Sequence, residues 1–150
     1  MSSLRKGFAA CALFAAVMEA HSQEPPKAAV IDVIASDYAF TALPARIAAG
    51  PTMFTFANHG KVQHEMSIGR LKSGATIQDV LKVSKAGGRL RDLIERSVGI
   101  LLAGPGKSPD GRLWVDLLPG QTYIVICNLK DTPASAPHMT MGMYTTFRPE

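Results

Sequence analysis

Residues 127 to 143 bring together side chains that bind soft metal ions. The stretch CNLKDTPASAPHMTMGM contains Cys127, His138 and three methionines, of which Met143 is the last. A thiolate, an imidazole and a thioether on one loop are a ligand set typical of copper sites. Each residue alone has a simpler interpretation, because free cysteines and methionines are most often core residues. The combination within one short loop favours a metal site.

A blue-copper site requires a second histidine, because its ligands are two histidines, one cysteine and a weak axial methionine. His59 lies between Asn58 and Gly60 in a predicted hairpin turn, whereas His64 begins a predicted strand. We favour His64 as the second histidine ligand, because a strand supports a side chain more rigidly than the tip of a turn does.

The axial ligand has two candidates. Met139, Met141 and Met143 alternate, and such residues share one face if the strand already runs there. Met143 is the expected ligand and Met141 the alternative. We expect Met139 in an apolar rim around an exposed edge of His138, a surface suited to the docking of a transient redox partner.

The first 22 residues have the pattern of an export signal. Two basic residues, Arg5 and Lys6, precede an apolar run from 7 to 18, and Ala20–His21–Ser22 is a small-x-small tripeptide. The run is shorter than the roughly 20 residues of a transmembrane helix. We therefore predict a signal peptide at 1–22, followed by a periplasmic domain at 23–150 with no integral membrane segment. A lipoprotein site at Cys11 is disfavoured, since most of the apolar run would follow it.

The composition of the predicted mature chain excludes a nucleic-acid-binding function. Removal of residues 1–22 lowers the formal net charge from +4 to +3, and the remaining basic residues are scattered rather than gathered in a stripe. Cys127 is the one cysteine left, so no internal disulfide can form. An odd cysteine in an oxidising compartment indicates a reactive or metal-bound sulfur. We expect one domain and a monomer.

Short strands are predicted along most of the chain. Runs rich in β-branched and aromatic residues occur at 29–35, 53–57, 64–68, 113–117, 122–128 and 143–148. Turn signals separate them, namely Pro44, Gly50–Pro51, Asn58–Gly60 and Pro119–Gly120. Strands at such close intervals predict an antiparallel sandwich or barrel.

A helical insertion is predicted from about residue 74 to residue 99. Thr76 is a capping-type residue with Asp79 three places on, and the apolar residues that follow have helical spacing. The same spacing returns after Gly87–Gly88, at Leu90, Leu93, Ile94 and Val98. We expect one or two short helices.

These residues resemble the cupredoxin family, the blue-copper fold of plastocyanin, azurin and pseudoazurin. Segment 56–64 (FANHGKVQH) resembles that family's strand, Asn-x-Gly turn and first ligand histidine, and segment 118–123 (LPGQTY) resembles the lead-in to its cysteine strand. Four residues separate His138 from Met143, as in plastocyanin-like loops. The resemblance extends from about 28 to 147. It is nearest to exported cupredoxin-like proteins with His-Glu-Met near the first ligand and Pro-His before a closing Gly-Met.

The resemblance implies an all-β, antiparallel Greek-key β-sandwich that binds copper through His64, Cys127, His138 and Met143. It implies an electron carrier rather than an enzyme. Electrons would pass to a redox partner protein through the exposed edge of His138, and the net charge of +3 would mildly favour acidic partners.

Two features depart from the family pattern. Ten residues, 128–137, separate Cys127 from His138, where plastocyanin-like loops have only a few. Glu65 replaces the asparagine that in plastocyanin follows the first histidine and donates a hydrogen bond to the cysteine loop. If Glu65 instead points at the metal, the site would be more tetragonal.

Other functions stay open from the sequence. One is a periplasmic copper carrier or resistance protein, in which methionine-rich surroundings serve exchange with a copper donor or acceptor. Another is an enzyme with Cys127 as nucleophile and His138 or His64 as base, which is disfavoured because nothing near the apolar strand lowers the thiol pKa. The last is a cupredoxin-like fold without metal.

Overall fold

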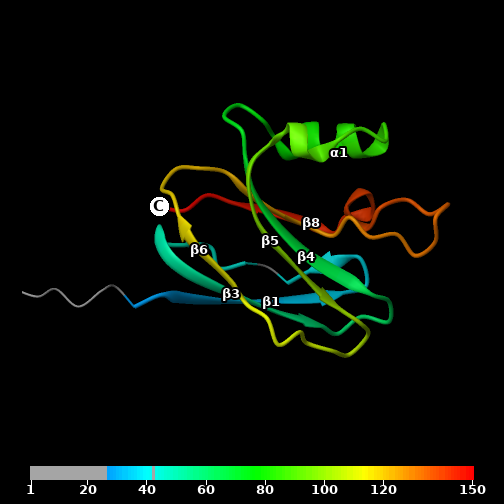
Figure 1. Cartoon of the computed structure of the whole chain (residues 1–150), viewed down its shortest axis with the longest axis horizontal. Helices are drawn as coiled ribbons and strands as arrows, with labels where there is room; N and C mark the ends of the chain where they lie inside the picture. Colours follow the sequence, from blue (N-terminus) through cyan, green and yellow to red (C-terminus); the bar gives the residue numbers. More distant parts are fainter. Residues whose placement is uncertain (1–26, 42) are drawn as a thin grey trace, which may run out of the picture.

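The computed structural model describes residues 27–41 and 43–150, so the predicted signal peptide at 1–22 lies outside the described residues. In the described part, two four-stranded sheets pack face to face as a sandwich (Figure 1). The strand order is β2–β1–β3–β6 in the first sheet and β5–β4–β7–β8 in the second. Among the described residues, no helix has the length and apolar character needed to cross a membrane.

The six predicted strands are confirmed, and two further strands occur. The first sheet contains β1 (Ala29–Ser36), β2 (Ala39–Phe40), β3 (Gly50–Asn58) and β6 (Leu113–Leu117). The second contains β4 (His64–Leu71), β5 (Ile94–Ala103), β7 (Tyr123–Ile126) and β8 (Tyr144–Phe147). Helix α1 (Ile77–Lys85) and two 3₁₀ turns, η1 (Leu90–Asp92) and η2 (His138–Met141), complete the fold.

One strand pair departs from the predicted antiparallel arrangement. β1 and β3 run parallel, in register from the pair Ala29–Thr52 to the pair Ala35–Asn58. Parallel neighbours cannot be joined by a tight hairpin and need a longer connection. Here β2 and the segment before β3 carry the chain back to the end at which β1 began.

The main core lies between the two sheets and is built from alternate residues of each strand. Val33 of β1, Phe54 of β3 and Val125 of β7 are fully buried there. A second apolar cluster lies outside the second sheet, where Val80 of α1 and Met139 of η2 pack against it. β7 is therefore buried on both faces, which explains why its sequence is continuously apolar rather than alternating.

The predicted helix at the start of the insertion is confirmed as α1. Thr76 caps it: its hydroxyl accepts a hydrogen bond from the Asp79 backbone N–H at 3.3 Å, and the Asp79 carboxylate accepts one from the Thr76 backbone N–H at 2.9 Å. This reciprocal pair satisfies two N–H groups at the helix start, where no intrahelical partner exists.

The prediction of one or two short helices holds for α1, but the helical spacing that follows it, up to Val98, is wrong. Residues 90–92 form one 3₁₀ turn, and Ile94 to Ala103 form β5, which pairs antiparallel with the edge of β4. Register shifts at Ile68/Gly69 and Arg70/Leu71 interrupt the ladder. These irregularities break the alternation that identifies a strand, and the apolar spacing then resembles that of a helix. Pairing with β4 outweighs this local pattern.

The predicted hairpin at Asn58–Gly60 is also wrong, because β3 and β4 belong to different sheets. The turn carries the chain from one sheet to the other, and the buried Asn58 side chain holds it in place. Its amide donates hydrogen bonds to the carbonyls of Val62 and Ala103, at 2.8 and 2.9 Å, and its oxygen accepts one from the Gly60 N–H at 2.8 Å.

Gly60 is needed at this turn because of close packing. A Cβ there would overlap the Asp37 carboxylate and lie 3.0 Å from His64 Nε2. We expect Gly60→Ala to lower the free energy of unfolding of the metal-free protein by about 1–3 kcal/mol, the usual cost of overpacking. Urea denaturation measures the change.

Gly104→Ala is the matched control, because no heavy atom lies within 4 Å of the Cβ it would add. We expect this variant to stay within about 0.5 kcal/mol of the wild type. Equal losses of stability in the two variants would contradict the assigned role of Gly60.

Candidate metal centre

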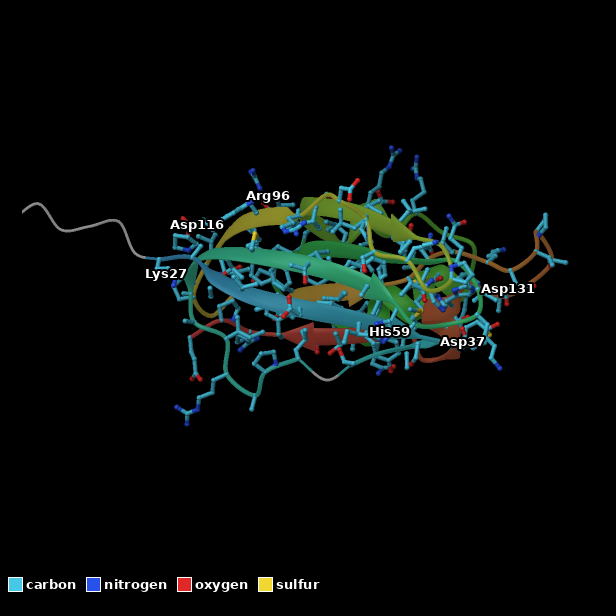
Figure 2. All side chains as sticks on the ribbon, turned by 90° about the horizontal axis from the view of Figure 1, so that it is seen from below. Lys27, Asp37, His59, Arg96, Asp116 and Asp131 are labelled. Carbon is cyan, nitrogen blue, oxygen red and sulfur yellow. The ribbon has the colours of Figure 1, made fainter. Side chains whose placement is uncertain are left out.

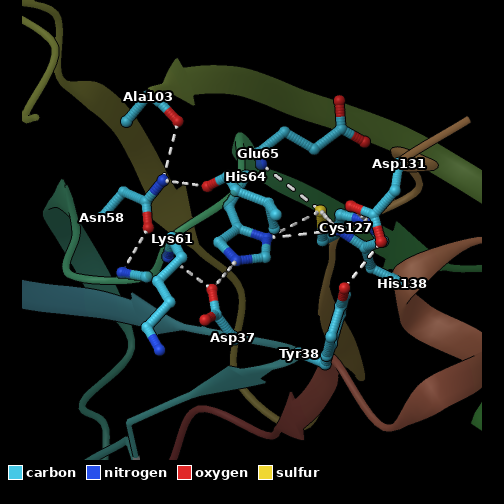
Figure 3. A network of polar contacts seen from close by, with 12 residues as sticks. Asp37, Tyr38, Asn58, Lys61, His64, Glu65, Ala103, Cys127, Asp131 and His138 are labelled. Carbon is cyan, nitrogen blue, oxygen red and sulfur yellow. Dashed lines mark hydrogen bonds and ion pairs between the residues drawn. The ribbon is translucent and has the colours of Figure 1, made fainter. Parts of the chain in front are cut away.

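Three of the residues expected as ligands meet at one end of the sandwich. His64 begins β4, Cys127 directly follows β7, and His138 begins η2. One potential ligand atom from each lies within 4.8 Å of the other two, and the three side chains are at most 1% exposed. Figure 3 shows the two imidazoles and the sulfur turned toward one another.

The three donor atoms form a triangle of the size of a metal coordination sphere. The His64 Nδ1 to His138 Nδ1 distance is 3.2 Å, and Cys127 Sγ lies 3.3 Å from His138 Nδ1 and 3.9 Å from His64 Nδ1. These edges fit around one ion whose bonds to nitrogen and sulfur are about 2.0–2.3 Å long. Two imidazoles and a thiolate are donors that suit copper. The residues present therefore fit the ion that the sequence suggests.

The long spacer between Cys127 and His138 does not loosen the site. The His138 N–H donates to the Leu129 carbonyl at 2.9 Å, and the Met139 N–H donates to the Cys127 carbonyl at 2.8 Å. These two bonds close the base of the loop, and the residues between them project outward from the sandwich (Figure 1). His138 thereby returns beside Cys127. A third backbone hydrogen bond joins Cys127 to the end of the stretch, because the Cys127 N–H donates to the Met143 carbonyl at 3.2 Å.

The three methionines of this stretch have different environments. Met143 is fully buried in the main core beside Cys127, and its N–H donates to the His138 carbonyl at 3.1 Å. Met141 is 44% exposed. The expectation that Met139 lies in a surface rim is wrong, because it is fully buried against α1. The residues fold into a 3₁₀ turn rather than a strand, so alternate residues do not share a face.

The expected exposed edge of His138 is also wrong. Its Nε2 lies 3.1 Å from Asp131 Oδ1, and the Tyr38 ring packs edge-on against it with 5.0 Å between ring centroids. On the other side of the site, His64 Nε2 lies 3.5 Å from Asp37 Oδ1. Sequence reasoning missed Asp37, Tyr38 and Asp131. Asp37 and Tyr38 lie far from the histidines along the chain, whereas Asp131 is seven residues before His138 but shows no spacing that links it to the imidazole.

Glu65 does not belong to the group of converging donor atoms. Its carboxylate accepts a hydrogen bond from the Asn128 backbone N–H at 2.9 Å, and its own N–H donates to Cys127 Sγ at 3.4 Å. The side chain thus braces the cysteine loop, as the plastocyanin asparagine was expected to do, but with donor and acceptor exchanged. His59, the alternative histidine, is exposed and also lies outside the group.

Burial controls the protonation of the metal-free site. It raises the pKa of the Cys127 thiol, against the opposing effect of the Glu65 and Leu129 N–H groups. It also lowers the pKa of His64, an effect that Asp37 partly offsets. The hydrogen bond from the Lys61 N–H lowers the pKa of Asp37.

The second carboxylate at the site is that of Asp131, whose pKa is lowered chiefly by the hydrogen bond from Tyr38. The metal-free site near neutral pH therefore contains a neutral thiol and a neutral His64 imidazole. Two ionised carboxylates, Asp37 and Asp131, lie behind the two histidines.

The fold has counterparts among solved structures. A reduced auracyanin from the photosynthetic bacterium Roseiflexus castenholzii is 18% identical over 83% of this chain and 99% of that chain, with a TM-score of 0.55. An azurin, Az-iso2, from Methylomonas sp. strain J is 15% identical over 83% and 99%, with a TM-score of 0.51.

Auracyanin A, a "blue" copper protein from the thermophilic bacterium Chloroflexus aurantiacus, is 18% identical over 83% of this chain and 100% of that chain, with a TM-score of 0.50. No protein-family model matches the sequence, and no curated protein matches it. At these identities the similarity concerns architecture, and it agrees with the resemblance seen in the sequence. The chain has the cupredoxin fold.

Proposed function

We propose that this protein is an exported copper protein that transfers electrons. His64, Cys127 and His138 would bind the ion, with Met143 as the weak axial ligand. The observation that carries the proposal is the convergence of two Nδ1 atoms and one Sγ in a buried site. Bound copper would supply a one-electron Cu(II)/Cu(I) couple. Similarity to a protein named as a blue copper protein supports this assignment.

The way the chain holds its ligands suits electron transfer. His64 and Cys127 lie at the ends of paired strands. The backbone of His138 is hydrogen-bonded to Leu129 and to Met143. Ligands held this firmly keep similar positions in both oxidation states, so little rearrangement accompanies each transfer. The Glu65 N–H adds a hydrogen bond to the sulfur, which is one means of tuning such a site.

The alternatives have less support. A copper carrier would use the methionine-rich stretch for exchange, but Met139 packs against α1 and Met141 is exposed. An enzyme with Cys127 as nucleophile requires a reachable thiolate, and this thiol is fully buried with a raised pKa. We further propose that residues 23–150 are the mature periplasmic domain, that it is monomeric, and that it meets its redox partner transiently.

Copper loading with Cys127→Ser tests the assignment. We expect residues 23–150 with Cu(II) to show an intense thiolate-to-copper absorption band that cycles reversibly on reduction and oxidation. Cys127→Ser should lose the band, because the sulfur donor is replaced by a hard hydroxyl. The exposed His59 provides the control, and His59→Ala should retain the full band. A wild-type protein that binds no copper would overturn the proposal.

A pair of methionine variants identifies the axial ligand. Loss of a weak axial thioether changes the reduction potential of such sites. We expect Met143→Leu to shift the Cu(II)/Cu(I) equilibrium about tenfold, or about 59 mV for a one-electron couple. Met141→Leu should leave the potential unchanged, because that side chain is 44% exposed. Protein-film voltammetry measures both, and a shift confined to Met141→Leu would reverse the assignment.

A further inference from the structure

The turn between β1 and β2 has an unusual backbone. Asp37 and Tyr38 form a two-residue turn between the paired residues Ser36 and Ala39. In the described part of the chain, Tyr38 is the one non-glycine residue with a positive φ, at 61°. This conformation is unfavourable for a bulky residue and persists where the surroundings impose it. Formation of the turn alone therefore does not explain why a tyrosine occupies this position.

The Tyr38 side chain provides the explanation through Asp131. Its hydroxyl donates a hydrogen bond to Asp131 Oδ2 at 2.6 Å, while Asp131 Oδ1 lies 3.1 Å from His138 Nε2. The Nδ1 of His138 faces Cys127 Sγ, so Nε2 carries the ring proton whenever Nδ1 binds a metal. Tyr38 thus holds the carboxylate that accepts this proton's hydrogen bond (Figure 3).

The neighbouring residue of the same turn reaches the other histidine. Asp37 Oδ1 accepts a hydrogen bond from the Lys61 N–H at 2.6 Å and lies 3.5 Å from His64 Nε2. Two adjacent residues of one turn therefore reach both imidazoles. Asp37 lies next to His64, and Tyr38 is linked to His138 through Asp131. Asp37 and Asp131 lie together at the same end of the sandwich (Figure 2).

The long spacer between Cys127 and His138 supplies one residue of this arrangement. Asp131 belongs to the ten residues that separate Cys127 from His138. A loop of only a few residues would connect Cys127 to His138 without passing around the outer edge of the imidazole. The extra length brings a carboxylate to Nε2 and places it within reach of Tyr38.

We propose that Asp37, Tyr38 and Asp131 form a clasp that orients both histidines and tunes the bound copper. The inference rests on the proposed function, since it takes the histidines as copper ligands. The three are positioning residues and do not contact the ion. A carboxylate that accepts a hydrogen bond from the outer nitrogen makes an imidazole a stronger donor. Its negative charge favours Cu(II) over Cu(I), so the clasp lowers the reduction potential.

Asp131→Asn removes the charge and retains an oxygen acceptor. We expect the Cu(II)/Cu(I) equilibrium of the loaded protein to shift about tenfold toward Cu(I), a modest effect because the Asp131 side chain is 31% exposed and partly screened. Asp116→Asn makes the same charge change on an exposed residue at the opposite end of the sandwich and should shift it less than about twofold (Figure 2).

Tyr38→Phe tests whether the hydroxyl positions Asp131. It keeps the ring against His138 but removes the hydrogen bond that holds the Asp131 carboxylate. The carboxylate is then held less firmly at His138 Nε2, so we expect the reduction potential to rise, in the same direction as in Asp131→Asn but by less. An unchanged potential in Tyr38→Phe, or equal shifts in Asp131→Asn and Asp116→Asn, would overturn the proposal.

A measurement on the metal-free protein keeps the test independent of copper. ¹⁵N NMR should show the His138 proton on Nε2 in the wild type and a mixture of tautomers in Asp131→Ala, which removes the acceptor. An unchanged tautomer in Asp131→Ala would overturn the clasp, provided that urea denaturation shows the variant folded. Failure of the wild type to bind copper would instead refute the proposed function, and the tautomer measurement would still decide whether the clasp exists.

Discussion

The structure of the site depends on the full burial of Cys127 between the sheets. Its N–H donates a hydrogen bond to the Met143 carbonyl. Its carbonyl and its sulfur accept hydrogen bonds from the N–H groups of Met139 and Glu65. The last strand, the 3₁₀ turn and β4 are thereby tied to one residue. A buried backbone group without a partner is costly, so the chain from 127 to 143 must wrap around the cysteine, and this wrapping brings His138 beside the sulfur.

The helical insertion supports the site from the other side of the sheet. Helix α1 packs on the outer face of the second sheet and contacts η2, with Val80 and Met139 in the same buried cluster. Because Met139 directly follows His138, burial of its side chain anchors the turn that presents the ligand. Burying a methionine fully is worth about 1.5–3 kcal/mol. The insertion that interrupts the strand pattern therefore stabilises the ligand loop.

The polar groups at this end of the sandwich are arranged in two layers. The inner layer, a thiol and two imidazoles, is buried, whereas the outer layer, Asp37 and Asp131, is about one-third exposed. Water can therefore stabilise the ionised carboxylates while the donors they face stay buried. This arrangement lets the outer charges act on the site without the desolvation cost of burying them.

Local patterns in the sequence predict six strands, the capped helix and the ligand loop, whereas the approach of His64 to that loop is a contact between distant segments. Each of the predicted features depends on neighbours along the chain: alternation for strands, Thr76 with Asp79 for the cap, and the ligand loop for Cys127 and His138. Strand β5, the parallel β1–β3 pair and the burial of Met139 and the His138 edge required the three-dimensional structure. So did the contact of Tyr38 with Asp131, 93 residues apart. These features arise from contacts between distant segments, and no local spacing encodes which edges pair or which side chain covers another.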